Sequence, residues 1–190
     1  MDFNMPLKIK NYKGLALETI TIIFAVLVAL AVDSWKEDMD RRHEVNVAMA
    51  SIRKEILSNL KQSIEVLSEN TRLVDELKQR ITLYEQGGSK TIRLRIVIGE
   101  LIDVAWLTTN NNQVVAWFDQ AALFNIGGVY HEQELYDVQI KHFRNFRLSY
   151  NPAMPIISQA KYQLRYLNSM NARVRELIEK YREYLRNNTE

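Results

Sequence analysis

The sequence predicts an all-α protein, with one N-terminal transmembrane helix followed by a long amphipathic helix and an antiparallel helical bundle. Residues 14–32 are mostly apolar and carry a single charge, Glu18. Two later stretches, 38–86 and 154–186, repeat apolar residues at intervals of three and four, the period of an amphipathic helix. Only six Gly and three Pro interrupt 190 residues. We therefore expect a short basic tail over 1–13, a transmembrane helix over 14–35 and a helical domain over 36–190.

The apolar stretch over 14–32 has the length of a membrane span. At about 1.5 Å per residue its nineteen residues reach roughly 28 Å, against a hydrocarbon core of about 30 Å. Trp35 follows where an interfacial aromatic anchor belongs. Two alternatives are a buried core helix and a cleaved signal peptide, which the basic tail and the small-x-small pattern at residues 29–31 would suit. The apolar run is longer than the usual ~7–15 residues of a signal peptide, which favours a retained anchor in the lipid bilayer.

The long helix over 38–86 has one continuous apolar stripe and neither Pro nor Gly before Gly87. The helix can continue from the membrane span as a single rod, and the acidic stretch at 37–40 is where we expect flexibility. Gly87 and Gly88 end it, because glycine readily adopts the left-handed conformation of a helix cap. The stripe comprises Val45, Met49, Ile52, Ile56, Leu60, Ile64, Leu67, Val74, Leu77, Ile81 and Tyr84.

Two or three shorter helices are predicted between the two long ones. Residues 91–107 begin with the alternation of a strand, but a lone strand would leave its backbone groups unpaired, so a helix is preferred. Asn112 is the expected N-cap of a helix over 112–125, and Gly127-Gly128 should end it. A further helix is expected over 131–149, where Asn151-Pro152 breaks the chain before the last helix at 154–186.

The anchor resembles an uncharacterised family of single-pass bacterial membrane proteins, classed as a domain of unknown function. The matching pattern is a glutamate, a branched apolar run, Leu-x-Ala-Leu and Trp-x-Glu. It is carried by Glu18, Leu27, Ala29, Leu30, Trp35 and Glu37. Ala25 departs from the family's usual glycine, and the segment after Asn112 keeps little of its pattern. The resemblance implies a bacterial inner (cytoplasmic) membrane location and no particular activity.

Lys/Arg residues flank the predicted span almost equally, with three Lys before it and Lys36, Arg41 and Arg42 after it. Acidic residues crowd the second flank. We expect the N-terminus in the cytoplasm and the body outside it.

One face of the predicted span combines Glu18 with small residues. Thr21, Ala25 and Ala29 follow at spacings of four, and small residues let transmembrane helices approach closely. We expect this face to make a helix–helix contact with a second copy or with another membrane protein. A passive interfacial carboxylate at Glu18 is the main alternative, and proton coupling is a remote one.

No pattern for catalysis, a cofactor or a metal emerges. The chain has no Cys, and no Ser/His/Asp arrangement stands out. His131 and Glu134 share a helix face, but no second pair completes a metal site. Lys141, Arg144 and Arg147 lie among aromatic residues, yet a net charge of +2 and an extracytoplasmic body argue against nucleic acid.

Trp106, Trp117, Phe118 and Phe124 lie on the short helices and are either core residues or the lining of a groove.

Taken together, these features of the sequence predict a membrane-anchored helical interaction or scaffold protein without enzymatic activity. A periplasmic sensor-like bundle that binds a ligand is the alternative.

Overall fold

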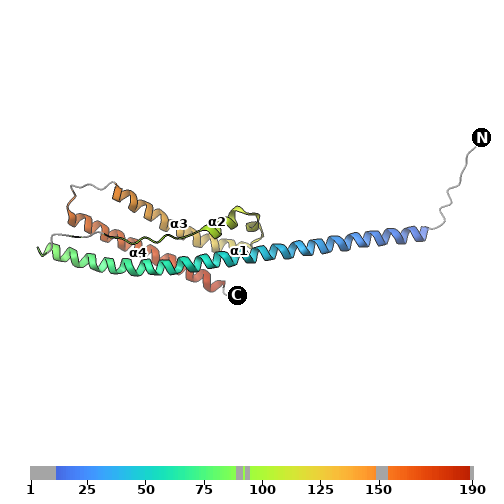
Figure 1. The fold of residues 1–190 in the computed structure, drawn as a ribbon, viewed down its shortest axis with the longest axis horizontal. Helices are drawn as coiled ribbons and strands as arrows, with labels where there is room; N and C mark the ends of the chain where they lie inside the picture. Colours follow the sequence, from blue (N-terminus) through green and yellow to red (C-terminus); the bar gives the residue numbers. More distant parts are fainter. Residues whose placement is uncertain (1–11, 89–91, 93–94, 149–153, 189–190) are drawn as a thin grey trace, which may run out of the picture. The chain divides into compact units, whose positions relative to one another are not determined.

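A computed structural model of the protein describes residues 12–88, 92, 95–148 and 154–188. The elements are α1 (Tyr12–Glu85), α2 (Val104–Asn111), the short 3-10 helix η1 (Gln113–Trp117), α3 (Gln120–Leu148) and α4 (Ile156–Asn187) (Figure 1). The described residues contain no strand, so the all-α prediction is confirmed for them. The chain divides into two compact units, Met1–Asn46 and Val47–Glu190, which are described separately.

The N-terminal unit carries the predicted span within α1. None of the apolar side chains in its most apolar window is buried, and Leu17 and Phe24 are each 67% exposed. The alternative of a buried core helix is therefore wrong. Among the described residues α1 is the one helix long and apolar enough to cross a membrane, a property that a signal sequence shares.

Helix α1 runs without interruption through residues 37–40, where flexibility was expected. Arg41 pairs there with Glu37 at 2.5 Å and with Asp38 at 3.7 Å. These ion pairs join residues three and four apart, the spacing that supports an exposed helix.

Glycine ends α1 as the sequence predicts. Gly87 has a φ of +77°, the left-handed conformation. The N–H of Gly88 donates to the Leu83 carbonyl at 2.9 Å, and the N–H of Gly87 donates to the Tyr84 carbonyl at 3.0 Å. These two bonds form a Schellman motif, which satisfies carbonyls that the end of a helix leaves without partners.

The C-terminal unit contains the hydrophobic core. The predicted stripe of α1 supplies Ile52, Ile56, Val74, Leu77 and Ile81 to it, whereas Ile64 is 43% exposed. Helix α4, predicted over 154–186, contributes a second buried row. That row comprises Ala160, Leu167, Met170, Val174, Leu177, Ile178 and Tyr181. The predicted break at Asn151-Pro152 lies outside the described residues.

The helix predicted over 91–107 is wrong over residues 95–103, whereas residues 91, 93 and 94 lie outside the described residues. The described residues from 95 to 103 are extended, and α2 begins only at Val104. The prediction assumed that a lone extended segment would lack partners for its backbone groups. Side chains from neighbouring helices supply those partners instead, as described below.

Two further boundaries differ from the prediction. Asn112 precedes the short η1 without a side-chain cap bond, and Asp119 caps α3 through its carboxylate, which accepts the Ala122 N–H at 2.7 Å. Gly127 and Gly128 lie inside α3, so the break expected between the helices over 112–125 and 131–149 is absent: η1 covers the start of the first range, and α3 covers the rest of it and continues to Leu148. Each glycine costs about 1 kcal/mol relative to alanine in a helix, and the neighbouring Ile126, Val129 and Tyr130 are buried, which offsets this cost.

Candidate functional site

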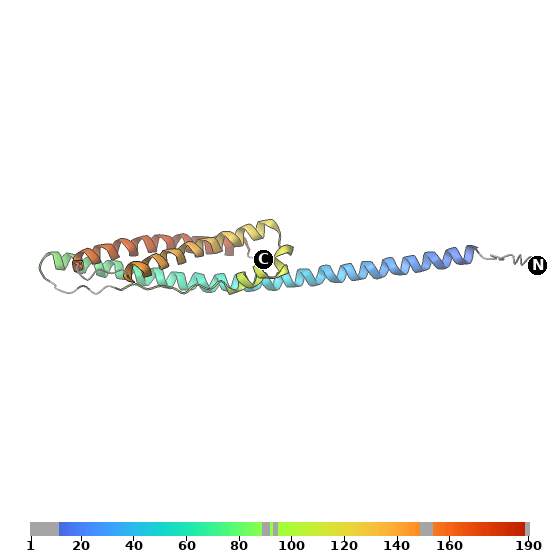
Figure 2. The same ribbon diagram turned by 90° about the horizontal axis from the view of Figure 1, so that it is seen from above.

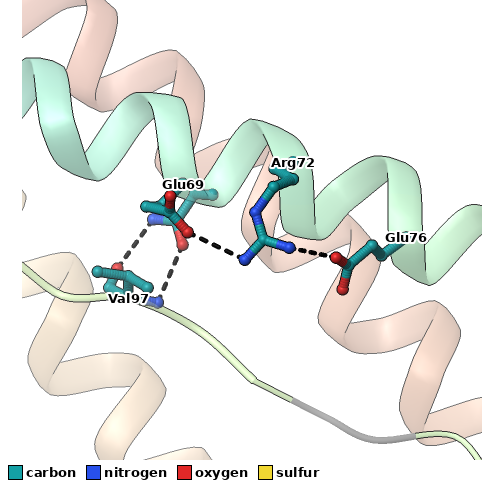
Figure 3. A network of polar contacts seen from close by, with 5 residues as sticks. Glu69, Arg72, Glu76 and Val97 are labelled. Atoms are coloured by element: carbon teal, nitrogen blue, oxygen red, sulfur yellow. Dashed lines mark hydrogen bonds and ion pairs between the residues drawn. The ribbon is translucent and has the colours of Figure 1, made fainter.

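The most unusual feature of the C-terminal unit is the extended segment 95–103, which lies along α1 in both views (Figures 1 and 2). Two asparagines of α1 hold it. The Asn70 amide donates to the Val97 carbonyl at 2.8 Å and accepts the Val97 N–H at 2.9 Å (Figure 3). The Asn59 amide does the same with Ile102, at 2.6 and 3.0 Å. Each carboxamide thus replaces the neighbouring strand that an extended chain normally requires.

The spacing of the two asparagines matches the extended segment. They are eleven residues apart on α1, which is close to three turns and about 16.5 Å along one helix face. Val97 and Ile102 are five residues apart, which spans about 16.5 Å of extended chain. The pairing of Asn59 with Ile102 and of Asn70 with Val97 means that the segment runs antiparallel to α1.

A buried network extends the contact of Asn59 to α3 and α4. Gln133 donates to the Ile102 carbonyl at 3.1 Å, and its own carbonyl oxygen accepts bonds from Asn59 at 3.1 Å and from the Tyr181 hydroxyl at 2.8 Å. Asn59 has no exposed surface, and Gln133 is 3% exposed. Buried polar groups must be hydrogen-bonded to avoid a desolvation penalty, so these residues tie the segment to three helices at once.

Glu55 performs a similar role one turn earlier on α1. Its carboxylate accepts the Ala105 N–H at 2.8 Å and the Tyr130 hydroxyl at 2.5 Å. Ala105 lies in the first turn of α2, whose N-cap residue Asp103 makes no side-chain cap bond. A negative charge at a helix N-terminus is favourable, so Glu55 acts as a cap supplied by another element.

Gly99 lies close to α1. Its N–H donates to the Tyr136 hydroxyl at 3.1 Å, and a Cβ placed on it would lie 2.9 Å from Cγ2 of Val66. We expect Gly99→Ala to lower the free energy of unfolding by about 1–3 kcal/mol, the usual range for overpacking. Urea unfolding of the full chain in mild detergent measures this effect. Val66→Ala should recover much of the loss in the double variant, and no recovery would contradict the steric explanation.

Five tyrosines, four of them buried and Tyr166 half-buried, predict a loss of stability at alkaline pH. Burial raises the pKa of Tyr130, Tyr136, Tyr166, Tyr181 and Tyr184 above the ordinary value for a phenol. Above about pH 10 the unfolded chain releases these protons while the folded chain retains them, so stability is full below that pH and falls above it. Each tyrosine should contribute about 1.4 kcal/mol per pH unit.

Urea unfolding monitored by tyrosinate absorbance between pH 8 and 11 tests this expectation. In the Tyr181→Phe variant, the free energy of unfolding should fall less steeply with pH, by about 1.4 kcal/mol per pH unit. Ionisation of all five phenols before the helices unfold would contradict it.

The four residues of the predicted membrane face all lie on α1. Glu18, Thr21, Ala25 and Ala29 lie on an unbroken helix and are all exposed in the N-terminal unit, as is Trp35 at 65%. The Thr21 hydroxyl donates to the Leu17 carbonyl at 2.9 Å, so its polar group is satisfied within the helix. The packing role of this face stays a prediction.

The four aromatic residues considered as a groove have different surroundings. Trp106 stacks on Tyr130 with ring centroids 5.6 Å apart, and Phe118 is buried. Trp117 is 37% exposed, whereas Phe124 is 83% exposed and borders a hollow of about 90 Å³. Of the four, Phe124 alone lines that hollow. The other residues around it are Asn125, Gly128, Val129, Lys180, Glu183, Tyr184 and Asn187.

The remaining candidates lie on the surface. His131 and Glu134 are 4.0 Å apart and largely exposed, and no group of three metal-ligating side chains occurs among the described residues. Lys141 and Arg144 are exposed while Tyr136 and Phe143 are buried. The side chain of Arg147 lies outside the described set.

Sequence reasoning missed the buried polar residues Glu55, Asn59, Asn70 and Gln133. The sequence does carry a sign of two of them. Asn59 and Asn70 lie near the apolar stripe of a helix, at positions where the helical pattern predicts apolar residues. Comparison with family models, curated proteins and solved structures finds no match for this chain.

Proposed function

We propose that the protein is a membrane-anchored helical interaction or scaffold protein without catalytic activity. The observation that carries the proposal is the exposed apolar surface of α1 over residues 14–32. An uncovered apolar surface of this length requires lipid or a protein partner. The C-terminal unit then presents an antiparallel helical bundle, supported by the pairing of Glu85 with Lys161 and of Arg53 with the Asn188 carbonyl.

The proposed location is the bacterial inner membrane, with the N-terminus in the cytoplasm and the body outside. The family resemblance and the lysines of the N-terminal tail support it. The face of Glu18, Thr21, Ala25 and Ala29 would bind a second copy or another membrane protein.

Native mass spectrometry of the full chain, extracted from membranes in mild detergent, tests the proposal. We expect the uncleaved mass in a dimer, a higher oligomer or a complex with a second protein. Ala25→Leu should dissociate that assembly. Ala16→Leu should not, because Ala16 is about two and a half turns from Ala25 and therefore lies on the opposite face of α1. A monomer truncated near Ala31 would reject the anchor and leave an exported bundle. An uncleaved monomer insensitive to both variants would reject self-association.

A further inference from the structure

The C-terminal unit leaves a short apolar stripe of α1 partly uncovered. Its residues alternate at spacings of three and four, the spacing of a coiled-coil seam. They are Leu57, Leu60, Ile64 and Leu67. Leu57 and Ile64 are 47% and 43% exposed, and the other two are half-buried. Apolar residues in such a seam are normally covered by the side chains of a second helix.

Helix α4 forms the other side of this stripe. The two pairs described above that join the ends of α1 and α4 make the helices antiparallel and set the stripe beside residues 175–186 of α4. At one end of the stripe the two helices border an open hollow of about 400 Å³. The hollow is lined by Arg53, Leu57, Arg182, Leu185 and Arg186. We call the stripe and this hollow together the α1–α4 groove.

Basic side chains flank the α1–α4 groove on both helices. They are Arg53, Lys54 and Lys61 on α1, and Arg175, Arg182 and Arg186 on α4. All are exposed except Arg53, which is half-buried. The carboxylates beside them are fewer, Glu65 on α1 and Glu179 on α4, and Glu179 pairs with Arg182 at 2.9 Å. The groove therefore combines an apolar floor with an excess of positive charge at its edges.

We infer that the α1–α4 groove binds an amphipathic helix of a partner protein, whose apolar stripe is flanked by Asp and Glu. An amphipathic helix lays its apolar face into an apolar groove, and charges beside a coiled-coil seam select the partner. Acidic flanks would complement the basic edges of this groove. A second copy fits poorly, because its own stripe carries Lys54 and Lys61 and would bring like charges together. The inference rests on the proposed function and gives the class of the protein partner.

Binding of a designed peptide to the full chain in mild non-ionic detergent tests the inference. The probe is a fluorescein-labelled helix of three heptads, with Leu at the a and d positions and Glu at the e and g positions. The matched control peptide has Lys in place of every Glu. By fluorescence anisotropy, the Glu peptide should bind at least tenfold more tightly than the Lys peptide. Raising the salt concentration from about 50 to about 500 mM should reduce that difference.

Charge reversal in the groove should exchange the two preferences. Arg182→Glu combined with Arg186→Glu should weaken binding of the Glu peptide at least tenfold and strengthen binding of the Lys peptide. The control, Arg80→Glu with Arg165→Glu, makes the same change of charge at exposed residues outside the groove. It should leave both affinities within about twofold. Because detergent micelles are the same in every sample, differences between variants report the groove.

Equal binding of the two peptides would overturn the inference, and this comparison requires no substitution in the chain. An affinity for the Glu peptide that survives Arg182→Glu with Arg186→Glu would overturn it as well. Dissociation of the oligomer by that variant in native mass spectrometry would identify a second copy as the occupant. Displacement of the Glu peptide by phosphatidylglycerol added to the micelles would identify an anionic lipid instead. Either result also overturns the inference.

The two proposals fail separately. A chain that stays in the membrane but does not distinguish the two peptides retains the proposed anchor and loses the groove. A chain that is cleaved near Ala31 but binds the Glu peptide selectively retains the groove and loses the anchor.

Discussion

Phe24→Lys combined with Leu27→Lys is expected to release the full chain from membranes. Both residues lie near the middle of the apolar stretch, and their side chains are 67% and 59% exposed. A lysine at the centre of a membrane helix costs about 2.5–3.5 kcal/mol, and each change also forfeits a favourable apolar residue. Two such changes should total about 6–8 kcal/mol, more than a ten-thousandfold shift in partitioning.

The measurement is the fraction of the chain that stays with membranes after extraction at alkaline pH. The matched control is Phe24→Leu with Leu27→Ile, which keeps the stretch apolar and should remain in the membrane pellet. Retention of the double lysine variant at the control level would mean that residues 14–32 do not hold the chain in the bilayer.

The sequence supports strong predictions where one face of a helix is repeated over many turns. The stripe of α1 and the buried row of α4 follow from apolar spacing alone, because burial of one face stabilises a long helix regardless of its neighbours. Gly87 was equally predictable, since the end of α1 requires a left-handed conformation that glycine adopts freely.

Predictions failed where tertiary contacts decide the local structure. Gly127 and Gly128 resemble a helix end in sequence, but buried residues on either side keep them within α3. The extended segment 95–103 is stable because Asn59 and Asn70 bind it, and no local pattern at 95–103 encodes that support. The same holds for the buried network around Asn59, whose residues come from three helices far apart in the chain.

The largest stability effect in the body is expected from Asn59→Leu. The substitution nearly preserves volume but removes both bonds to Ile102 and the bond to Gln133. The part-buried Ile102 N–H would then lack the partner that holds it, and an unsatisfied group costs up to about 1–3 kcal/mol in addition to the lost bonds. We expect the free energy of unfolding to fall by about 2–4 kcal/mol, which corresponds to a Tm lower by about 6–12 °C for a body of this size.

Thermal and urea unfolding of the full chain in mild detergent measure this loss, and Asn168→Leu on the exposed face of α4 is the matched control. That control should change stability by less than about 0.5 kcal/mol, as is usual for surface positions. Because Tyr181 shares Gln133 with Asn59, the variant Asn59→Leu/Tyr181→Phe should be less destabilised than the sum of its single variants. If Asn59→Leu behaves like Asn168→Leu, apolar contacts rather than the asparagine amide hold the extended segment.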